Sequence, residues 1–552
     1  MPQPSRAKQQ TLQIKFWLFG LEVSYFVVNY VPAPIWKLMV LIFDVMMFWF
    51  HKVYNILSGR SATSRYKQDL QNAQSLEEWS FVASRLDSIS GGELWRQNFI
   101  SNKYDYKLIS ERLHSLRNAR ENKDFPHLLT LLRSSLLRNF GGIAEKELYT
   151  RAYSGTKTLI ETYVAEILKC LIFINDFEYK DDYTNSVNSF NQLKLDFFHD
   201  VRQTYGSTAL ILQGGSLFGL CHIGVIKAMY FKGLLPRIIS GSGVGAVVAA
   251  FVCCLIDDQL LSHLVTLSKQ MANLPDEVLD KRSGKVVENV VVRGFSEDTL
   301  NFMKYTKSTI KHLTFEEAYL STGKVLNIMV HPTNSSAPFL LNYITTPNVM
   351  IISALYCSMG SGVLVENAHL YVKDINGDIK PMDYPEPCIF MTPHEANTYM
   401  GITYTRLTEL FNVNHFIVSL ARPYLAALVG NGLRHSSTWY PKRVLRTVMG
   451  LELQHRIDML NRSGLLFGFI KRLAVDDKTP TTSTSEITIV PHLRTLVKDF
   501  TRIFDVSRSN ENIPYWVLVG ERSVWPLFPI LWTRTAIEFT LDDLYNNQRT
   551  MR

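Results

Sequence analysis

The feature that most constrains this chain is a strand, glycine turn and helix succession that occurs twice between residues 207 and 256. The first copy is the short apolar run STALILQGGS, which leads into the helical stretch FGLCHIGVIKAMYFKGL. The second is PRIISGSG, which leads into the apolar helix VGAVVAAFVCCLI. Continuous apolar strands that alternate with helices are typical of a parallel sheet covered by helices. We therefore predict an α/β fold, with KVLNIMVHP and NHFIVSLARP as further strands.

The segments on either side of this pattern are mainly helical. In YDYKLISERLHSLRNARENKD, Ile109, Leu113 and Leu116 recur at the spacing of one helix face. The glycines of LLRNFGG predict a helix stop, and GTKTLIETYVAEILKCLIFI predicts another long helix, whereas residues 180–205 are polar and mixed. Beyond the strands, RVLRTVMGLELQHRIDMLNRSG is amphipathic, and the polar linker VDDKTPTTSTSE precedes a final block from residue 487.

Two apolar stretches near the N-terminus predict contact with a membrane. Residues 16–30 and 35–50 are both shorter than the roughly 20 apolar residues that span a bilayer, and each contains an acidic residue. Pro32 and Pro34 break helical continuity between them. We expect a helical hairpin that enters one leaflet; a pair of buried core helices is the alternative.

The composition of the chain bears on the kind of partner it binds and on the redox state of its compartment. A net charge of +8 on 552 residues would favour an anionic surface, but no basic run is dense enough to predict nucleic-acid binding, and an ordinary basic surface explains it equally well. The six cysteines form no CxxC pair and no metal-ligand spacing, so we predict buried free thiols, a reducing compartment and no metal. They are Cys170, Cys221, Cys253, Cys254, Cys357 and Cys388.

The two glycine turns contain candidate parts of a hydrolytic site. Gly214 and Gly215 precede a helix, where backbone N–H groups can stabilise an oxyanion; the alternative is that they only permit a tight turn. The second turn matches the outer positions of a G-x-S-x-G nucleophile elbow, with Gly241 and Gly245 in place. The central position, where the attacking hydroxyl must stand, is Gly243, and Ser242 lies one residue early.

The chain resembles the patatin-like lipases, in particular the fungal triacylglycerol lipases of lipid droplets. The motifs that carry this resemblance are the helical segments already quoted, GGSLFGLCHIGV, ISGSGVGA, RLTELFNVNHFIVS, ITIVP and GERSVWP. The resemblance implies a three-layer α/β/α sandwich with a mainly parallel sheet, preceded by a membrane hairpin and a helical domain. It also implies a serine–aspartate dyad that requires neither a histidine nor a cofactor, so His222 and His415 are expected to be structural.

The position that the resemblance assigns to the dyad aspartate is also altered. The spacing upstream of Arg406 leads to Glu395, and the glycine that follows the aspartate in the family is absent here. Asp374 and Asp378 match a family segment ahead of the dyad and are discounted as bases. A third departure is CSMGSGVL, residues 357–364, where such lipases carry a proline-containing turn beside the pocket.

We therefore expect a member of this lipase family with lost or strongly reduced hydrolase activity and a lipid-binding or regulatory role. Its expected ligands are neutral acyl glycerides, its partner an active lipase homologue, and its location the cytosolic face of lipid droplets or the endoplasmic reticulum membrane. An active lipase or acyltransferase that uses Ser242 is the alternative; a nucleotide-binding module is disfavoured because GGSLFG lacks the lysine of a phosphate loop. The expected domains are a hairpin (1–58), a helical domain (59–205), a patatin-like domain (206–425) and a C-terminal extension (426–552).

Overall fold

A computed structural model provides the coordinates of the chain. It describes residues 45–47, 49, 62–177, 184–215, 217–272, 295–334, 337–386, 388–392, 400–421, 486–491 and 509–550, with a few single positions between 452 and 503. The chain divides into two units, Met1–Asn72 and Ala73–Arg552. The predicted domain boundaries stay predictions.

The first unit contributes one complete described helix, α3 (Ala62–Asn72). The predicted hairpin lies outside the described residues except for four helical positions, 45–47 and 49, whose side chains are exposed. Over the part of the chain that the structure describes, no helix is long and apolar enough to cross a membrane.

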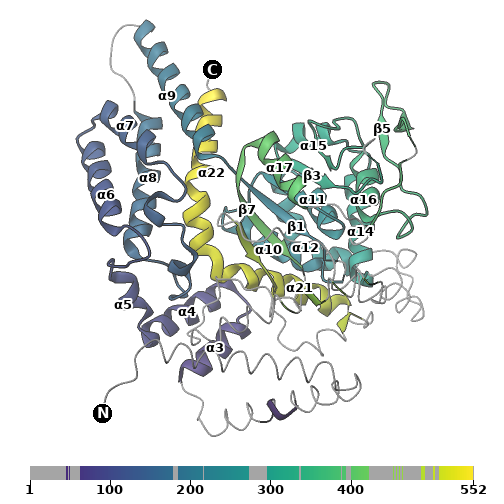
Figure 1. Cartoon of the computed structure of the whole chain (residues 1–552), viewed down its shortest axis with the longest axis horizontal. Helices are drawn as coiled ribbons and strands as arrows, with labels where there is room; N and C mark the ends of the chain where they lie inside the picture. Colours follow the sequence, from purple (N-terminus) through teal and green to yellow (C-terminus); the bar gives the residue numbers. More distant parts are fainter. Residues whose placement is uncertain are drawn as a thin grey trace, which may run out of the picture. The chain divides into compact units, whose positions relative to one another are not determined.

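The second unit contains a six-stranded sheet, in the order β4-β3-β2-β1-β7-β8 (Figure 1). Its strands are β1 (Ser207–Gln213), β2 (Ile238–Gly241), β3 (Val325–Met329), β4 (Leu340–Leu341), β7 (Val413–Leu420) and β8 (Glu486–Ile489). All neighbouring pairs are parallel except β3 with β4. The predicted α/β class with a mainly parallel sheet is confirmed, and the four strands predicted from sequence are all present.

The two helices predicted after β1 and β2 are present, together with further helices of the α/β part. They are α10 (Leu220–Phe231), α11 (Val244–Cys254), α12 (Asp257–Ala272), α14 (Glu297–Ile310), α15 (Phe315–Thr322), α16 (Ile351–Met359) and α17 (Met400–Phe411). Every residue of α11 is buried, and this helix packs against β1, β2 and β3. A separate antiparallel pair, β5 (Tyr371–Lys373) and β6 (Ile379–Pro381), extends from this part of the fold.

Residues before β1 form a block of helices. They are α4 (Leu76–Ser90), α5 (Gly92–Gln97), α6 (Tyr106–Glu121), α7 (Phe125–Ser135), α8 (Thr158–Asp176) and α9 (Thr184–Tyr205), with the 3-10 turns η1 (Phe140–Gly142) and η2 (Lys146–Tyr149). Side chains of Ser75, Asp105 and Asp124 accept hydrogen bonds from the first turns of α4, α6 and α7, which fixes where these helices begin.

One sequence expectation for the helical block needs correction. The predicted apolar face of α6 is confirmed, because Ile109, Leu113 and Leu116 are buried. The helix before Gly141, however, ends earlier, at Ser135, and the glycine itself lies in η1 with a positive φ of 59°. Most of the polar, mixed stretch before β1 forms the 22-residue helix α9, in line with the mainly helical character predicted for this block.

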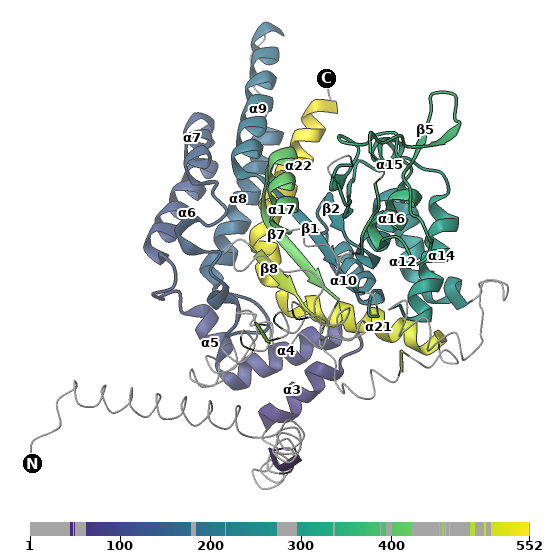
Figure 2. The ribbon, with the colours of Figure 1, turned by 45° about the vertical axis from the view of Figure 1, so that its right-hand side comes forward.

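The end of the chain completes the fold. Strand β8 pairs with β7 at the edge of the sheet, and α21 (Ser509–Val524), η6 (Trp525–Leu527) and α22 (Phe528–Thr550) follow it (Figure 2). Helix α21 crosses α10 at close range, since a Cβ atom on Gly224 would stand 1.9 Å from the Val517 carbonyl oxygen and one on Gly520 would stand 2.1 Å from that of Cys221. Only glycine permits such an approach of two helix backbones.

A buried ion pair ties α22 to the helical block. The Arg138 guanidinium donates to Glu538 Oε2 at 3.1 Å, and the Thr208 backbone N–H donates to the other oxygen, Oε1, at 2.6 Å. Burial raises the pKa of Glu538, although Arg138 favours its charged form. Glu538 therefore links the helical block to β1 and α22, a role that the sequence did not indicate. Figure 1 shows α22 between α8, α9 and the sheet.

The six cysteines are all free and buried, as predicted. Burial raises the thiol pKa of each, for example that of Cys253 to about 12. Such thiols are protonated at neutral pH and therefore unreactive.

Candidate active site

The two glycine turns lie at the carboxyl ends of neighbouring parallel strands, where ligands bind in open α/β sheets. The first turn follows β1, and Gly214 and Gly215 have positive φ values of 64° and 88°. The second turn follows β2. A hydrogen bond from the Gly245 N–H to the Gly214 carbonyl oxygen, 3.2 Å long, joins the two turns directly.

The first turn is closely surrounded. A Cβ atom on Gly215 would stand 3.0 Å from the Ala421 methyl carbon and 3.1 Å from His222 Nε2. The position therefore needs glycine for its conformation and has almost no room for a side chain. The oxyanion role of Gly214 and Gly215 stays a prediction.

His222 supports this turn as a neutral, buried side chain. Its Nδ1 lies 2.9 Å from the Ser419 hydroxyl, and the residue is fully buried. Burial lowers its pKa to about 4, although the neighbouring backbone at Gln213 and Gly214 favours the charged form. His415 is also buried and lies 3.2 Å from the Thr208 hydroxyl, in the network around Glu538.

The second turn has the geometry of a strand-to-helix elbow. Gly243 directly precedes α11 with φ 55° and ψ −121°, a conformation that side-chain-bearing residues rarely adopt. The two outer glycines are required by space, because a Cβ atom would stand 2.5 Å from Ala246 backbone atoms at Gly241 and 2.2 Å from the Leu212 carbonyl oxygen at Gly245. At Gly243 itself, a Cβ atom would meet nothing within 4 Å.

Ser242 occupies a different environment from the apex. Its backbone N–H donates to the Leu212 carbonyl oxygen at 3.2 Å, which continues the β1–β2 pairing by one residue. The residue is only 1% exposed, whereas Gly243 is partly exposed. The hydroxyl-bearing position of this turn is therefore buried, and the position that opens outward bears no side chain.

Sequence reasoning missed one polar residue that contacts the elbow. The Gly243 N–H donates to the Ser358 hydroxyl at 3.1 Å, and that hydroxyl donates to the Met329 carbonyl oxygen at 2.6 Å. Ser358 thus joins the apex of the second turn to the end of β3. The available signal was a serine near the end of the apolar helix IISALYCSM, inside a segment already identified as a departure from the family pattern.

Close backbone contacts shape the segment that follows Ser358. Gly360 has a φ of 93°, and a Cβ atom there would stand 2.6 Å from the Thr392 backbone nitrogen. The Ser361 N–H donates to the Phe390 carbonyl oxygen at 2.8 Å. This part of the site wall is therefore built by close backbone contact between residues 360–361 and 390–392.

Apolar side chains surround the start of α11. Val244, the residue after the apex, packs in a buried cluster with Phe295 and Leu300, and Met303, Val363 and Leu364 lie partly buried against it. The surroundings of the elbow are therefore suited to hydrocarbon rather than to a charged ligand.

The structure does not describe the second half of the predicted dyad. Glu395 is outside the described residues. Asp374 bonds with Lys380 in the β5–β6 hairpin, at 2.9 Å, and its backbone N–H donates to the Asp378 carbonyl oxygen. Across the described residues, no group of three or more histidine, cysteine, aspartate or glutamate side chains is placed to hold a metal ion.

Comparison with known proteins identifies the family. Residues 210–373 match the model of the patatin-like phospholipases, and residues 56–203 match a domain of unknown function, DUF3336. Triacylglycerol lipase 3 of Saccharomyces cerevisiae is 35% identical over 97% of this chain and 97% of its own length. The chain belongs to the patatin-like triacylglycerol lipase family. Within this family, triacylglycerol lipase ptl1 of Schizosaccharomyces pombe is 34% identical over 93% of the chain and 91% of its own length.

Proposed function

We propose that this member of the patatin-like lipase family acts in neutral lipid metabolism with lost or strongly reduced hydrolase activity. The observation that carries the proposal is the open apex at Gly243, which has elbow geometry but no hydroxyl. Loss of a catalytic serine costs on the order of 10⁶ in turnover, and a residual of about 10³–10⁴ over water can survive through the oxyanion hole and binding. Glycine at the apex also avoids the strain of roughly 1–3 kcal/mol that a serine would carry there.

The retained function in this proposal is binding of acyl glycerides, with a regulatory consequence. Two relatives of nearly full coverage are named triacylglycerol lipases, which supports neutral lipid as the ligand class. The apolar cluster around Val244 offers hydrocarbon contact beside the apex. We extend the proposal to the surface of lipid droplets or the endoplasmic reticulum, through residues 16–50, and to an active lipase homologue as partner.

The proposal is tested by assaying the purified chain on triacylglycerol and short-chain esters. Turnover no greater than that of the denatured chain is expected, because no hydroxyl stands at the apex. Turnover well above that of the denatured chain, together with fluorophosphonate labelling that disappears in Ser242→Ala, would instead establish the alternative, an active lipase or acyltransferase using Ser242.

A gain-of-function series tests whether the loss is confined to the chemistry. We expect Gly243→Ser alone to give weak hydrolysis and the combination with Glu395→Asp and Ala396→Gly to give more. A triple variant that folds and binds acyl glyceride without hydrolysing it would show that Glu395 is not the position of the missing base.

A further inference from the structure

A cavity lies where the helical block meets the end of the chain. It has a volume of about 750 Å³. Its walls come from α4, the segment at 153–165, the end of α10, η6 and the start of α22. The Gly243 turn contributes nothing to it, so its role is independent of the function proposed above.

Five of the sixteen residues that line the cavity are aromatic. Trp79, Tyr153, Trp525, Phe528 and Trp532 all line the cavity. Trp79 and Trp525 are buried neighbours whose ring centroids lie 6.5 Å apart at an angle of 55°. The face of an aromatic ring attracts a cation, and several such rings together form the usual receptor for a quaternary ammonium group.

The Phe528 ring already demonstrates this attraction. The Lys232 ammonium nitrogen lies 5.8 Å from the centroid of that ring, and both residues line the cavity. A cation in this cavity is therefore compatible with the surrounding ring arrangement.

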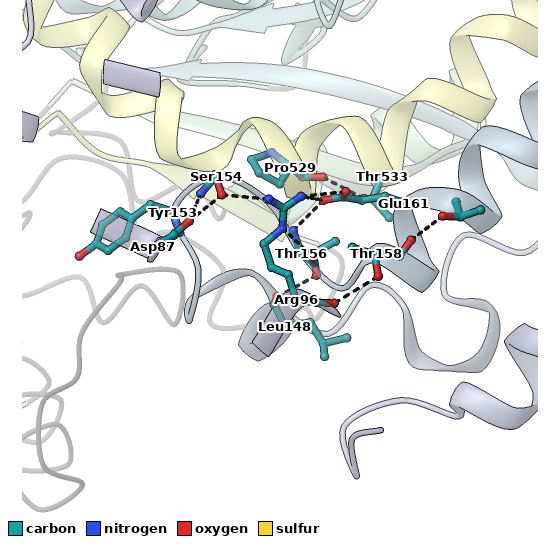
Figure 3. A network of polar contacts seen from close by, with 11 residues as sticks. Asp87, Arg96, Leu148, Tyr153, Ser154, Thr156, Thr158, Glu161, Pro529 and Thr533 are labelled. Carbon is teal, nitrogen blue, oxygen red and sulfur yellow. Dashed lines mark hydrogen bonds and ion pairs between the residues drawn. The ribbon is translucent and has the colours of Figure 1, made fainter. Parts of the chain in front are cut away.

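One carboxylate of the cavity wall is fully engaged. Glu161 accepts hydrogen bonds from Arg96 at 3.0 and 3.1 Å and from the Thr156 backbone N–H at 2.9 Å, as Figure 3 shows. A Cβ atom on Gly155 would stand 2.4 Å from this carboxylate, so the residues are closely packed. Glu161 therefore contributes shape to the cavity and little net charge.

Two other charges at the cavity are not neutralised in this way. Glu77 and Lys232 are both exposed, and among the described residues neither has an ion-pair partner within 4.0 Å. The cavity thus combines aromatic rings, one uncompensated negative charge and one uncompensated positive charge. This set is complementary to a zwitterion that has a bulky, weakly hydrated cation.

We propose that this cavity binds a phosphocholine group. The trimethylammonium group packs against the aromatic rings near Glu77, and the phosphate pairs with Lys232. An acyl chain alone would gain from the rings but would leave both charges without partners. An inorganic anion would use Lys232 only and would be repelled by Glu77.

The test uses the purified full chain and isothermal titration calorimetry with glycerophosphocholine and glycerophosphoethanolamine. The ethanolamine compound has the same charges but a small, strongly hydrated ammonium group. We expect the choline compound to bind about tenfold more tightly, the effect of cation–π contacts worth about 1.4 kcal/mol. Equal affinities, or no binding of either compound, would overturn the proposal.

Three variants separate the contributions of an aromatic ring and of a positive charge to glycerophosphocholine affinity from general effects on the protein. Trp532→Leu keeps an apolar wall and is expected to weaken glycerophosphocholine binding about tenfold, and Lys232→Glu is expected to weaken it at least as much. Lys169→Glu, the same charge change at an exposed position on α8 outside the cavity, should leave affinity unchanged. Unchanged affinity in Trp532→Leu, with a native melting temperature, would contradict the ring contribution and the proposal.

Flotation with vesicles then distinguishes the source of the group. Binding that is stronger to phosphatidylcholine vesicles than to vesicles in which half of that lipid is replaced by phosphatidylethanolamine identifies a membrane headgroup. Binding of glycerophosphocholine without such a vesicle preference identifies a soluble phosphocholine compound as the ligand. Both results support the proposed chemistry and differ only in where the ligand comes from.

Discussion

The two glycine turns of the sheet occupy equivalent places in the fold, but their individual glycines are required for different reasons. At Gly215 the surrounding atoms leave almost no room for a side chain, and the same is true of Gly241 and Gly245 in the second turn. At Gly243 only the backbone angle demands glycine, and the space beside it is open. The second turn therefore has room for a side chain that its sequence does not supply.

The largest expected effect is at a closed position. Gly245→Ala would place a Cβ atom about 2 Å from the Leu212 carbonyl oxygen, and backbone cannot yield as a flexible side chain would. We expect a loss of at least about 3 kcal/mol in the free energy of unfolding, or failure to fold. Urea denaturation measures it. A Gly245→Ala protein as stable as the parent would show that the two kinds of glycine do not differ.

Acidification should weaken the first turn more than the second, through His222. Because its folded pKa, about 4, lies below the unfolded value of about 6.5, the unfolded state binds more protons between these values. The contribution of neutral His222 to the free energy of unfolding is complete above pH 6.5. It falls by roughly 3 kcal/mol as the pH falls towards 4.

Urea denaturation at pH 7.5 and pH 4.5 measures this loss. The control is His222→Gln, in which we expect a shallower pH dependence over the same range, since the titrating group is gone. An identical slope in the variant would assign the effect to His415, whose pKa is lowered by burial and by Arg138.

The open position should tolerate the substitution that the closed positions reject. Gly243→Ala adds a methyl group into free space, so only the positive φ opposes it, at roughly 1–2 kcal/mol. The variant should fold, and circular dichroism and urea denaturation check this. A loss equal to that of Gly245→Ala would show that the apex is closed as well.

The smallest effect concerns the hydrogen bond that holds the apex. Ser358→Ala removes the acceptor of the Gly243 N–H and the donor to the Met329 carbonyl oxygen, which should cost about 1 kcal/mol. Amide hydrogen exchange is the more specific measurement, because the Gly243 amide should exchange faster while that of Ser242, bonded to Leu212, should not change. Equal acceleration of both amides would indicate general loosening of the turn.

Local patterns predicted the central sheet well and the parts built from distant segments poorly. Strands β1 and β2 are continuous apolar runs between glycines and helices, so a few residues determine them. Strand β8 has only four residues and pairs with β7 across more than sixty positions of chain, and no local pattern encodes such a pairing. Ser358 was missed for the same reason, since its partner Gly243 lies 115 residues away.

Helix α9 shows a different limit of sequence reasoning. Its first residues, TNSVNSFNQ, include asparagine, serine and threonine, which have low helix propensity, so local preference gives little support for a helix there. Its later part buries Phe197, Phe198 and Val201, and this tertiary packing overrides the local preference. The elbow could be located from its glycines, but whether a side chain has room there depends on atoms from β1 and α11 that only the fold brings together.

The late position of β8, α21 and α22 has a consequence for biosynthesis. A nascent chain that has emerged from the ribosome only as far as β7 lacks the strand that covers one edge of its sheet and the helix that crosses α10 through Gly520. Unpaired strand edges and exposed apolar surface in such a species promote aggregation. We therefore expect the sheet to be completed only when translation is almost finished, and a stop codon that removes β8, α21 and α22 to leave a chain that cannot complete this fold.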